Sequence, residues 1–201
     1  MRIIYRKKKP AKQLTILLDL DGVTCDMIGP LLNIYNEEYN ISTKNLKRSD
    51  INTWRLKPEL KEIFQETPHF FQALPLIHGA WKGVRWLGLR HNLIICTDPS
   101  NNYDIARDKM IWLKCMGFDK YPLIMTPIKH IIDCDIIIDD SPHHIKSFIK
   151  ANTGKLKLSI LMDQPYNKEV INDITNMPQF MRAYNWDDII EYVRWWEKFV
   201  S

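Results

Sequence analysis

The sequence has few cysteines, no internal repeat and no low-complexity segment, and these absences narrow the class of protein. None of the four cysteines has the paired spacing of a zinc site; they are Cys25, Cys96, Cys115 and Cys134. The apolar run that begins at Leu14 is far too short to cross a bilayer. Charged residues precede it without an apolar stretch, so no signal peptide is indicated. We therefore expect reduced thiols and a cytoplasmic protein without a membrane segment.

Length and composition indicate an ordinary globular protein. The 201 residues suffice for one domain, or for one domain with a small insertion, and are 45% hydrophobic and 26% charged. The net charge of +4 is mild, and part of it comes from Arg6 to Lys9 in a basic terminal segment, residues 1–12. A non-enzymatic nucleic-acid-binding arm is one interpretation of this segment, but a solvated chain end is the more common one.

Apolar segments alternate with segments of helical spacing along the chain. Five segments predict buried strands, at 14–18, 92–97, 122–125, 135–138 and 156–162. Helices are predicted over 27–40, 58–64, 79–90, 102–116, 142–151 and 186–199. Asn101 or Asn102 is expected to cap the fourth of these helices, and Gly117 to close it. Such alternation predicts an α/β fold, with a Rossmann-like parallel sheet of about five strands and helices on both faces.

One connection is much longer than a parallel sheet requires. About seventy residues separate the first two predicted strands, where a crossover needs roughly a dozen. We expect residues 24–79 to form an inserted helical cap, and residues 13–23 and 80–201 to form the core domain. The insertion leaves the sheet beside Asp19 and Asp21, so it is placed to cover them.

Polar side chains recur where the predicted strands end. The first strand is followed by Asp19 and Asp21, which point the same way because strand side chains alternate. The other members of the set are Thr97 and Asp98 after the second strand, Lys129 before the fourth, and Asp139 and Asp140 after it. An aspartate after a strand is by itself more often a turn former or a helix cap. Thr97 could simply end its strand, and Lys129 could equally be an exposed lysine. In a parallel sheet, however, all of them would meet at one edge.

The charges of this set indicate what it holds. Four carboxylates would repel one another without positive partners. Mg²⁺, Lys129 and a proton on Asp21 would bring the cluster to neutrality. Because Mg²⁺ is commonly bound by a few carboxylates together with a phosphate, the set is typical of a site for a phosphate ester and its metal ion.

Ordered motifs then connect the chain to a known family. Asp19 to Val23, Thr97, Lys129 and Ile138 to Asp140 resemble the four motifs of the haloacid dehalogenase (HAD) superfamily. Further segments resemble 5′(3′)-deoxyribonucleotidases, at 70–80, 95–99, 125–129, 138–142 and 163–167. The resemblance covers about residues 14–167. It implies a phosphatase that acts on (deoxy)nucleoside monophosphates, with another small ester such as a sugar phosphate as the alternative substrate.

The resemblance also implies roles for single residues. Asp19 would attack phosphorus to form an aspartyl-phosphate, and Asp21 would act as general acid and base. The expected Mg²⁺ ligands are Asp19, the backbone carbonyl of Asp21 and Asp139, while Asp140 would hold the ion through water or orient its ligands. The expected phosphate-binding residues are Thr97, Asp98 and Lys129.

Three aromatic residues, and two positions at which this chain differs from animal members of the family, bear on which nucleotide is the substrate. Phe70, Phe71 and Trp54 either fill the core of the cap or form the wall of a pocket on which a base stacks. Asp98 and Ser141 stand where animal members of the family have serine and arginine, which leaves the base and sugar preference open. The expected partner is a small nucleotide, and a homodimer is left open.

Overall fold

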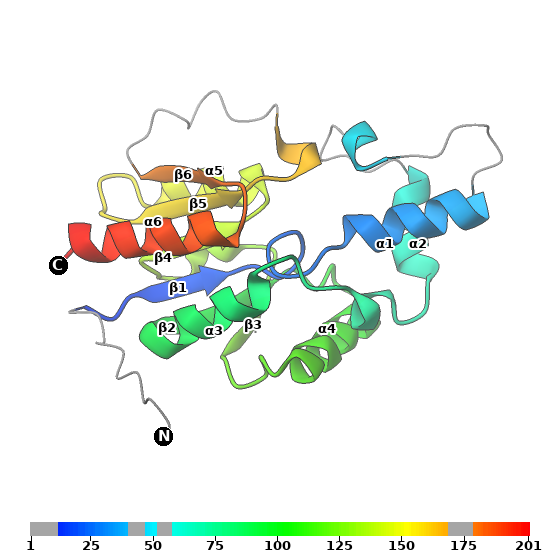
Figure 1. Ribbon diagram of the computed structural model, residues 1–201, viewed down its shortest axis with the longest axis horizontal. Coiled ribbons are helices and arrows are strands. Elements are labelled where there is room, and N and C mark those ends of the chain that lie inside the picture. The colour runs from blue at the N-terminus through cyan, green and yellow to red at the C-terminus, as the bar shows by residue number, and fades with distance from the viewer. Residues whose placement is uncertain (1–11, 40–46, 52–57, 169–178) are drawn as a thin grey trace, which may run out of the picture.

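The computed structural model describes residues 12–39, 47–51, 58–168 and 179–201. Its centre is a parallel sheet of six strands in the order β3-β2-β1-β4-β5-β6. The strands are β1 (Thr15–Leu18), β2 (Asn92–Thr97), β3 (Leu123–Met125), β4 (Ile136–Asp139), β5 (Leu158–Met162) and β6 (Phe180–Ala183). This confirms the predicted α/β class, and Figure 1 shows the sheet with helices packed around it.

Both faces of the sheet are buried because alternate strand residues enter two different apolar clusters. Ile16 and Leu18 of β1 pack in the larger cluster, whereas Leu17 between them packs in the smaller one. The larger cluster includes residues of α3 (Ala80–Arg90) and α6 (Trp186–Phe199), and the smaller includes residues of α5 (Pro142–Ala151). The helices therefore cover opposite faces, as the near-continuous apolar strands predict.

The helices that follow β2 and β4 begin at side-chain caps, which fix where each strand-to-helix loop ends. In α4 (Tyr103–Met116), the side chain of Asn102 accepts hydrogen bonds from the backbone N–H groups of Asp104 and Ile105. Gly117, in the left-handed region, ends this helix as predicted. In α5, Ser141 is the cap.

The sixth strand, β6, is the one strand that the sequence pattern did not predict. It is an edge strand of four residues, and it carries the charged Arg182 between partly and fully buried neighbours. Such a segment lacks the apolar run by which the other strands were recognised. It extends the sheet beyond β5 and leaves the order around β1 unchanged.

The long connection from β1 to α3 carries two helices, α1 (Ile28–Ile34) and α2 (Pro58–Glu66), and short turns at 35–39, 48–50 and 70–73. In Figure 1 these helices lie beyond the end of β1, on the side toward which its arrow points. The predicted helix over 27–40 is regular only to Ile34 and then continues as a π-helical turn. The division into a core at 13–23 and 80–201 and a cap at 24–79 stays a prediction. Residues 1–11 of the basic segment and Trp54 lie outside the described residues.

Within the part of the chain that the structure describes, no helix combines the length and the apolar character that spanning a bilayer requires.

Candidate active site

The acidic residues lie between β1 and β4, where the order of the strands in the sheet reverses. Strands β1 and β4 are neighbours, although each leads on to a different half of the sheet. Ligands of open α/β sheets bind in the crevice at the carboxyl ends of such strands. Asp19 follows β1 directly, and its backbone N–H donates to the carbonyl oxygen of Ile138, 3.0 Å away in β4. Asp139 ends β4 and Asp140 follows it.

Three carboxylates meet at this point. Asp19, Asp139 and Asp140 each offer one oxygen, and these oxygens all lie within 4.8 Å of one another. All three residues are buried, with Asp139 having no exposed surface. The structure therefore brings together Asp19 and Asp139, which the sequence predicted as metal ligands, and Asp140, which it predicted to act through water or by orienting the ligands. The roles of all three stay a prediction.

Lys129 joins two of these carboxylates. Its buried ammonium lies 2.7 Å from Asp19 Oδ1 and 2.7 Å from Asp139 Oδ2. Burial works against the charged amine, but the two carboxylates outweigh it and hold the pKa of Lys129 above its usual range. The lysine, which the sequence also allowed as an exposed side chain, is thus a permanent positive charge inside the cluster.

Asp19 and Asp139 respond differently to the same surroundings. Burial raises the pKa of Asp19 to about 7, and the charges of Asp139 and Asp21 add to this effect against that of Lys129. Burial also acts to raise the pKa of Asp139, but Lys129 and a hydrogen bond from His144 lower it to about 2. Asp139 is therefore ionised at neutral pH, whereas Asp19 without further positive charge is only partly so.

His144 was not predicted as part of the site. Its Nδ1 lies 3.1 Å from both oxygens of Asp139, and the backbone N–H of Ser141 donates to the same carboxylate at 2.8 Å. His143 and His144 could suggest metal ligands in the sequence, but polar residues that open a helix are the more common interpretation, and both residues lie in the first turn of α5. The contact with Asp139 arises because this first turn of α5 starts where β4 ends.

Asp140 is held from the opposite side by the segment after β5. The Tyr166 hydroxyl donates to Asp140 Oδ2, and the Asn167 side-chain amide donates to the Asp140 carbonyl oxygen at 2.8 Å. Gln164 of the same segment donates to the Gly22 carbonyl oxygen at 2.6 Å. Burial, together with the charges of Asp19 and Asp139, raises the pKa of Asp140 well above its usual range. The segment thus ties the loop after β1 to the loop after β4.

Gly22 is the residue around which these groups pack. Its φ of +74° lies in the left-handed region. A Cβ atom there would lie 2.7 Å from Asp140 Cγ and closer still to Asp140 Oδ2 and the Tyr166 hydroxyl oxygen. Only a residue without a side chain fits the close approach of the first motif to Asp140.

Asp21 lies at the edge of the cluster and binds residues from β2 and α4. Thr97 Oγ1 lies 3.4 Å from Asp21 Oδ2, and Lys109 Nζ lies 2.6 Å from the same oxygen. Sequence reasoning missed Lys109, which sits in the middle of a predicted helix. It adds a second buried positive charge beside the aspartates, at the edge of the cluster where Asp21 lies.

The other predicted residues take different positions. The Asp98 carboxylate accepts a hydrogen bond of 2.7 Å from the Ser100 backbone N–H, so its oxygen is turned toward its own loop. Phe70 and Phe71 are both buried and pack edge to face, with ring centroids 5.3 Å apart. A phosphate-binding role for Asp98 and a base pocket at Phe70, Phe71 and Trp54 stay predictions.

The donor set fits a divalent cation. Hard cations prefer oxygen ligands. The cluster offers three carboxylate oxygens, one from each of the buried residues Asp19, Asp139 and Asp140. Burial, with the charges of the neighbouring carboxylates, raises the pKa of Asp19 and of Asp140, although Lys129 acts to lower both. A cation at this position would supply the missing positive charge.

Solved structures with the same fold are HAD-like hydrolases. One, from Burkholderia xenovorans, is 14% identical with a TM-score of 0.59, and the match covers 92% of this chain and 98% of that one. Another, a HAD hydrolase from Bacillus subtilis described as bound to magnesium, is 16% identical with a TM-score of 0.60 and coverages of 90% and 99%. The fold is therefore that of the HAD-like hydrolases, as the motif resemblance predicted.

The family is narrower than the fold. The model of the family described as 5′ nucleotidase, deoxy (pyrimidine), cytosolic type C protein matches residues 12–196. The chain belongs to this family and is a phosphoric monoester hydrolase. It is 26% identical over 187 residues to a 5′(3′)-deoxyribonucleotidase of Bacillus subtilis, with 87% of this chain and 95% of that protein covered. A 5′(3′)-deoxyribonucleotidase of Clostridium acetobutylicum is 29% identical over 185 residues, with coverages of 86% and 90%.

Proposed function

We propose that the protein is a Mg²⁺-dependent phosphatase that converts deoxynucleoside monophosphates to nucleosides through an aspartyl-phosphate on Asp19. The observation that carries this proposal is the convergence of Asp19, Asp139 and Asp140 within 4.8 Å, with Lys129 between two of them. The magnesium bound to the Bacillus subtilis HAD hydrolase and the deoxyribonucleotidase names of the sequence relatives support it. A cytoplasmic location and a homodimer stay predictions.

Each residue then has a task in the reaction. Asp19 attacks phosphorus, since its carboxylate is the one that follows the central strand β1 and faces the cluster. Asp21 protonates the leaving ester oxygen and later takes a proton from the attacking water. Thr97 and Lys129 donate hydrogen bonds to the phosphoryl oxygens, where negative charge spreads during the transfer. Lys129 suits this task because its two carboxylate contacts leave one N–H of the ammonium available.

The metal ion would be held by Asp19, Asp139, Asp140 and the Asp21 backbone carbonyl. When bound, Mg²⁺ supplies positive charge to the phosphoryl oxygens and favours the ionised form of the Asp19 carboxylate. Tyr166 and Asn167 hold Asp140 in place for this purpose, and His144 does the same for Asp139.

The substrate class is tested by phosphate release from a panel of esters. We expect the highest kcat/KM for a deoxynucleoside monophosphate when all common 5′- and 3′-nucleotides, ribo and deoxy, are compared with sugar phosphates. Activity should require Mg²⁺ and disappear in EDTA. Faster hydrolysis of a sugar phosphate would move the assignment to the alternative substrate class, and phosphate release that persists in EDTA would exclude the metal.

The covalent intermediate has its own test. Quenching a turnover reaction with hydroxylamine converts an acyl phosphate to a hydroxamate, which peptide mass spectrometry locates. We expect the modification at Asp19 and only in the presence of substrate. Modification of another carboxylate, or none under conditions where a known acyl-phosphate enzyme is modified, would contradict this step.

Binding of Mg²⁺ should release protons, and its affinity should rise with pH. The reason is that Asp19, with its pKa raised to about 7 by burial, must be ionised to bind the cation. Calorimetric titrations at pH 6 and pH 8, each in two buffers of different ionisation enthalpy, measure affinity and proton release together. We expect tighter binding at pH 8 and more proton release at pH 6. Equal affinity at both values would contradict the binding of the cation by an Asp19 carboxylate whose pKa is raised to about 7.

A further inference from the structure

Lys109 is a buried lysine to which neither the motifs nor the proposed reaction assigns a task. It lies in α4 and is only 3% exposed. Burying an ammonium group is costly unless it is paired and hydrogen-bonded, so a lysine in this position requires partners. Its partners are all close to the candidate active site.

The ammonium makes three hydrogen bonds. It donates to Asp21 Oδ2 at 2.6 Å, to Thr97 Oγ1 at 2.9 Å and to the Asp98 backbone carbonyl oxygen at 2.6 Å. An ammonium has three N–H groups, and here each has an acceptor. Lys109 therefore has no N–H left for a phosphate oxygen, which distinguishes it from Lys129.

The three acceptors belong to two loops, one after β1 and one after β2, whose relative position sets the geometry of the site. Asp21 follows β1, while Thr97 and Asp98 follow β2, and Ser100 and Asn101 just beyond them have positive φ values of 53° and 51°. Lys109 thus holds the proposed proton donor against the proposed phosphate-binding hydroxyl. The strong bond from Lys109 occupies Oδ2 of Asp21, whereas Oδ1 accepts only the weaker S–H contact of Cys25, whose Sγ lies 3.6 Å away. Oδ1 is therefore the oxygen that can reach the ester.

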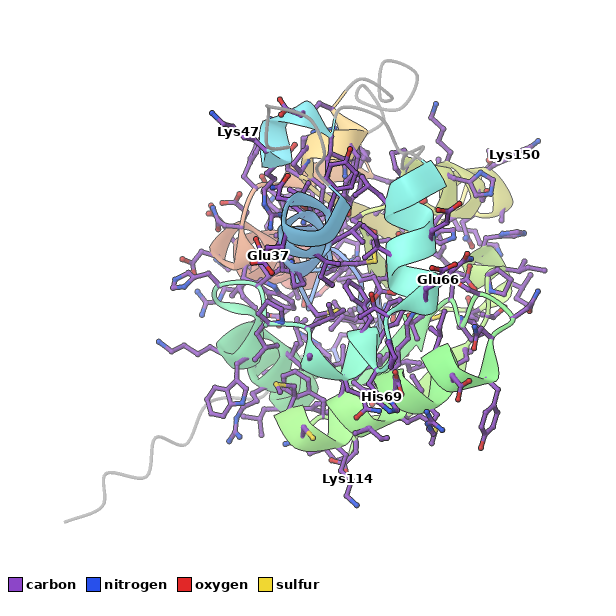
Figure 2. All side chains as sticks on the ribbon, turned by 90° about the vertical axis from the view of Figure 1, so that its right-hand side faces the viewer. Glu37, Lys47, Glu66, His69, Lys114 and Lys150 are labelled. Atoms are coloured by element: carbon purple, nitrogen blue, oxygen red, sulfur yellow. The ribbon has the colours of Figure 1, made fainter. Side chains whose placement is uncertain are left out.

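The helix that carries Lys109 is itself fixed to the loops around the site. Trp112, one turn further along α4, donates to the Leu74 carbonyl oxygen at 2.7 Å, and Asp108 accepts from Gln72 at 2.7 Å. The Lys109 ammonium also lies 5.0 Å from the centre of the Phe71 ring. His69, which precedes the turn at 70–73, lies directly against α4 in Figure 2, with its Nδ1 3.4 Å from Asp108 Oδ1. The lysine is held on a rigid support from which it can position Asp21.

We propose that Lys109 is a positioning residue that orients Asp21 for protonation of the leaving oxygen. The inference rests on the proposed function, since it concerns the reaction that Asp21 performs there. If this is correct, loss of Lys109 should lower kcat/KM most for substrates whose leaving group must be protonated.

The test compares two substrates in the variant K109M. A deoxynucleotide leaves as an alkoxide and needs protonation, whereas p-nitrophenyl phosphate leaves as a stable phenolate and does not. The ratio kcat/KM reports steps up to departure of the leaving group, so it isolates this role from the later attack of water. We expect K109M to lose roughly 10²- to 10³-fold in kcat/KM on the deoxynucleotide, the usual contribution of a positioned acid, and far less on p-nitrophenyl phosphate.

A double-mutant cycle gives the second readout. If Lys109 acts only through Asp21, K109M should cost nothing further in a D21N background. The double variant also removes both charges together, so it leaves no unpaired ion in the interior. K109M alone should fold, because the Asp21 side chain is 24% exposed and water can replace the lost partner. Thermal melts of each variant check this.

The control is K114M, which removes a lysine from the same helix. Lys114 is exposed and extends outward at the lower edge of Figure 2. It should leave both kcat/KM values unchanged. Equal losses of K109M on both substrates, a further loss in the D21N background, or no loss at all would each overturn the positioning role. A wild-type protein inactive on both substrates would instead overturn the proposed function.

Discussion

The variant D19N should lose phosphatase activity by roughly 10⁴-fold or more in kcat, the scale of loss seen when a nucleophile is removed. The asparagine amide has nearly the shape of the carboxylate but cannot attack phosphorus. In metal-free buffer the melting temperature should stay equal or rise, since burial already acts against the charged form of Asp19. Phosphate release and thermal melts with and without Mg²⁺ measure both effects.

A second aspartate serves as the matched control for D19N. Asp133 is paired with Lys157, and its side chain is 94% exposed, away from the cluster. D133N makes the same chemical change and should keep full activity. If D19N retained substantial Mg²⁺-dependent turnover, Asp19 would not be the nucleophile, and the aspartyl-phosphate route would be wrong.

Parallel strand order made much of the site predictable. Once Leu14 to Leu18 and the later apolar runs are taken as neighbouring parallel strands, the residues after them must meet at one edge. This reasoning alone was enough to predict that Asp19, Thr97 and Asp139 lie close together. The metal-binding and catalytic roles given to them came from the family motifs, because position alone does not distinguish a ligand from a turn former.

Lys109 was missed although the sequence carried a signal for it. It falls on the buried face of α4 with Ile105 and Trp112, at helical spacing of four and three residues. A lysine on an apolar stripe requires a buried partner, but the stripe does not say which one. Tyr166 and His144 were missed for a related reason, since their contacts depend on how loops from different strands meet.

Sheet width was also less predictable than sheet order. β6 is short and contains Arg182, whose side chain binds Asp163 and the Asn167 carbonyl oxygen. Those contacts support the segment that holds Asp140, so the unpredicted strand indirectly stabilises the site. Hydrophobic pattern alone recognises strands buried on both faces and overlooks an edge strand of this kind.

The variant G22A should be the most destabilising single-methyl change near the site, lowering the free energy of unfolding by about 2–5 kcal/mol. About 1–2 kcal/mol comes from placing a Cβ at positive φ, and the rest comes from overlap with packed neighbours. Those neighbours are Asp140 and the Tyr166 hydroxyl, so the displacement falls on a proposed metal ligand. We expect Mg²⁺ affinity to fall by 10- to 100-fold, the usual effect of disturbing the groups that hold a ligand.

A second glycine separates the two contributions. Gly154 has a φ of +80°, similar to the +74° of Gly22, but a Cβ atom there would meet nothing within 4 Å. G154A should therefore show only the backbone cost of about 1–2 kcal/mol and should leave metal binding unchanged. Urea unfolding of both variants and calorimetric Mg²⁺ titration give the comparison. If G22A were no less stable than G154A, the close packing of Asp140 and Tyr166 on the first motif would not be what requires glycine at position 22.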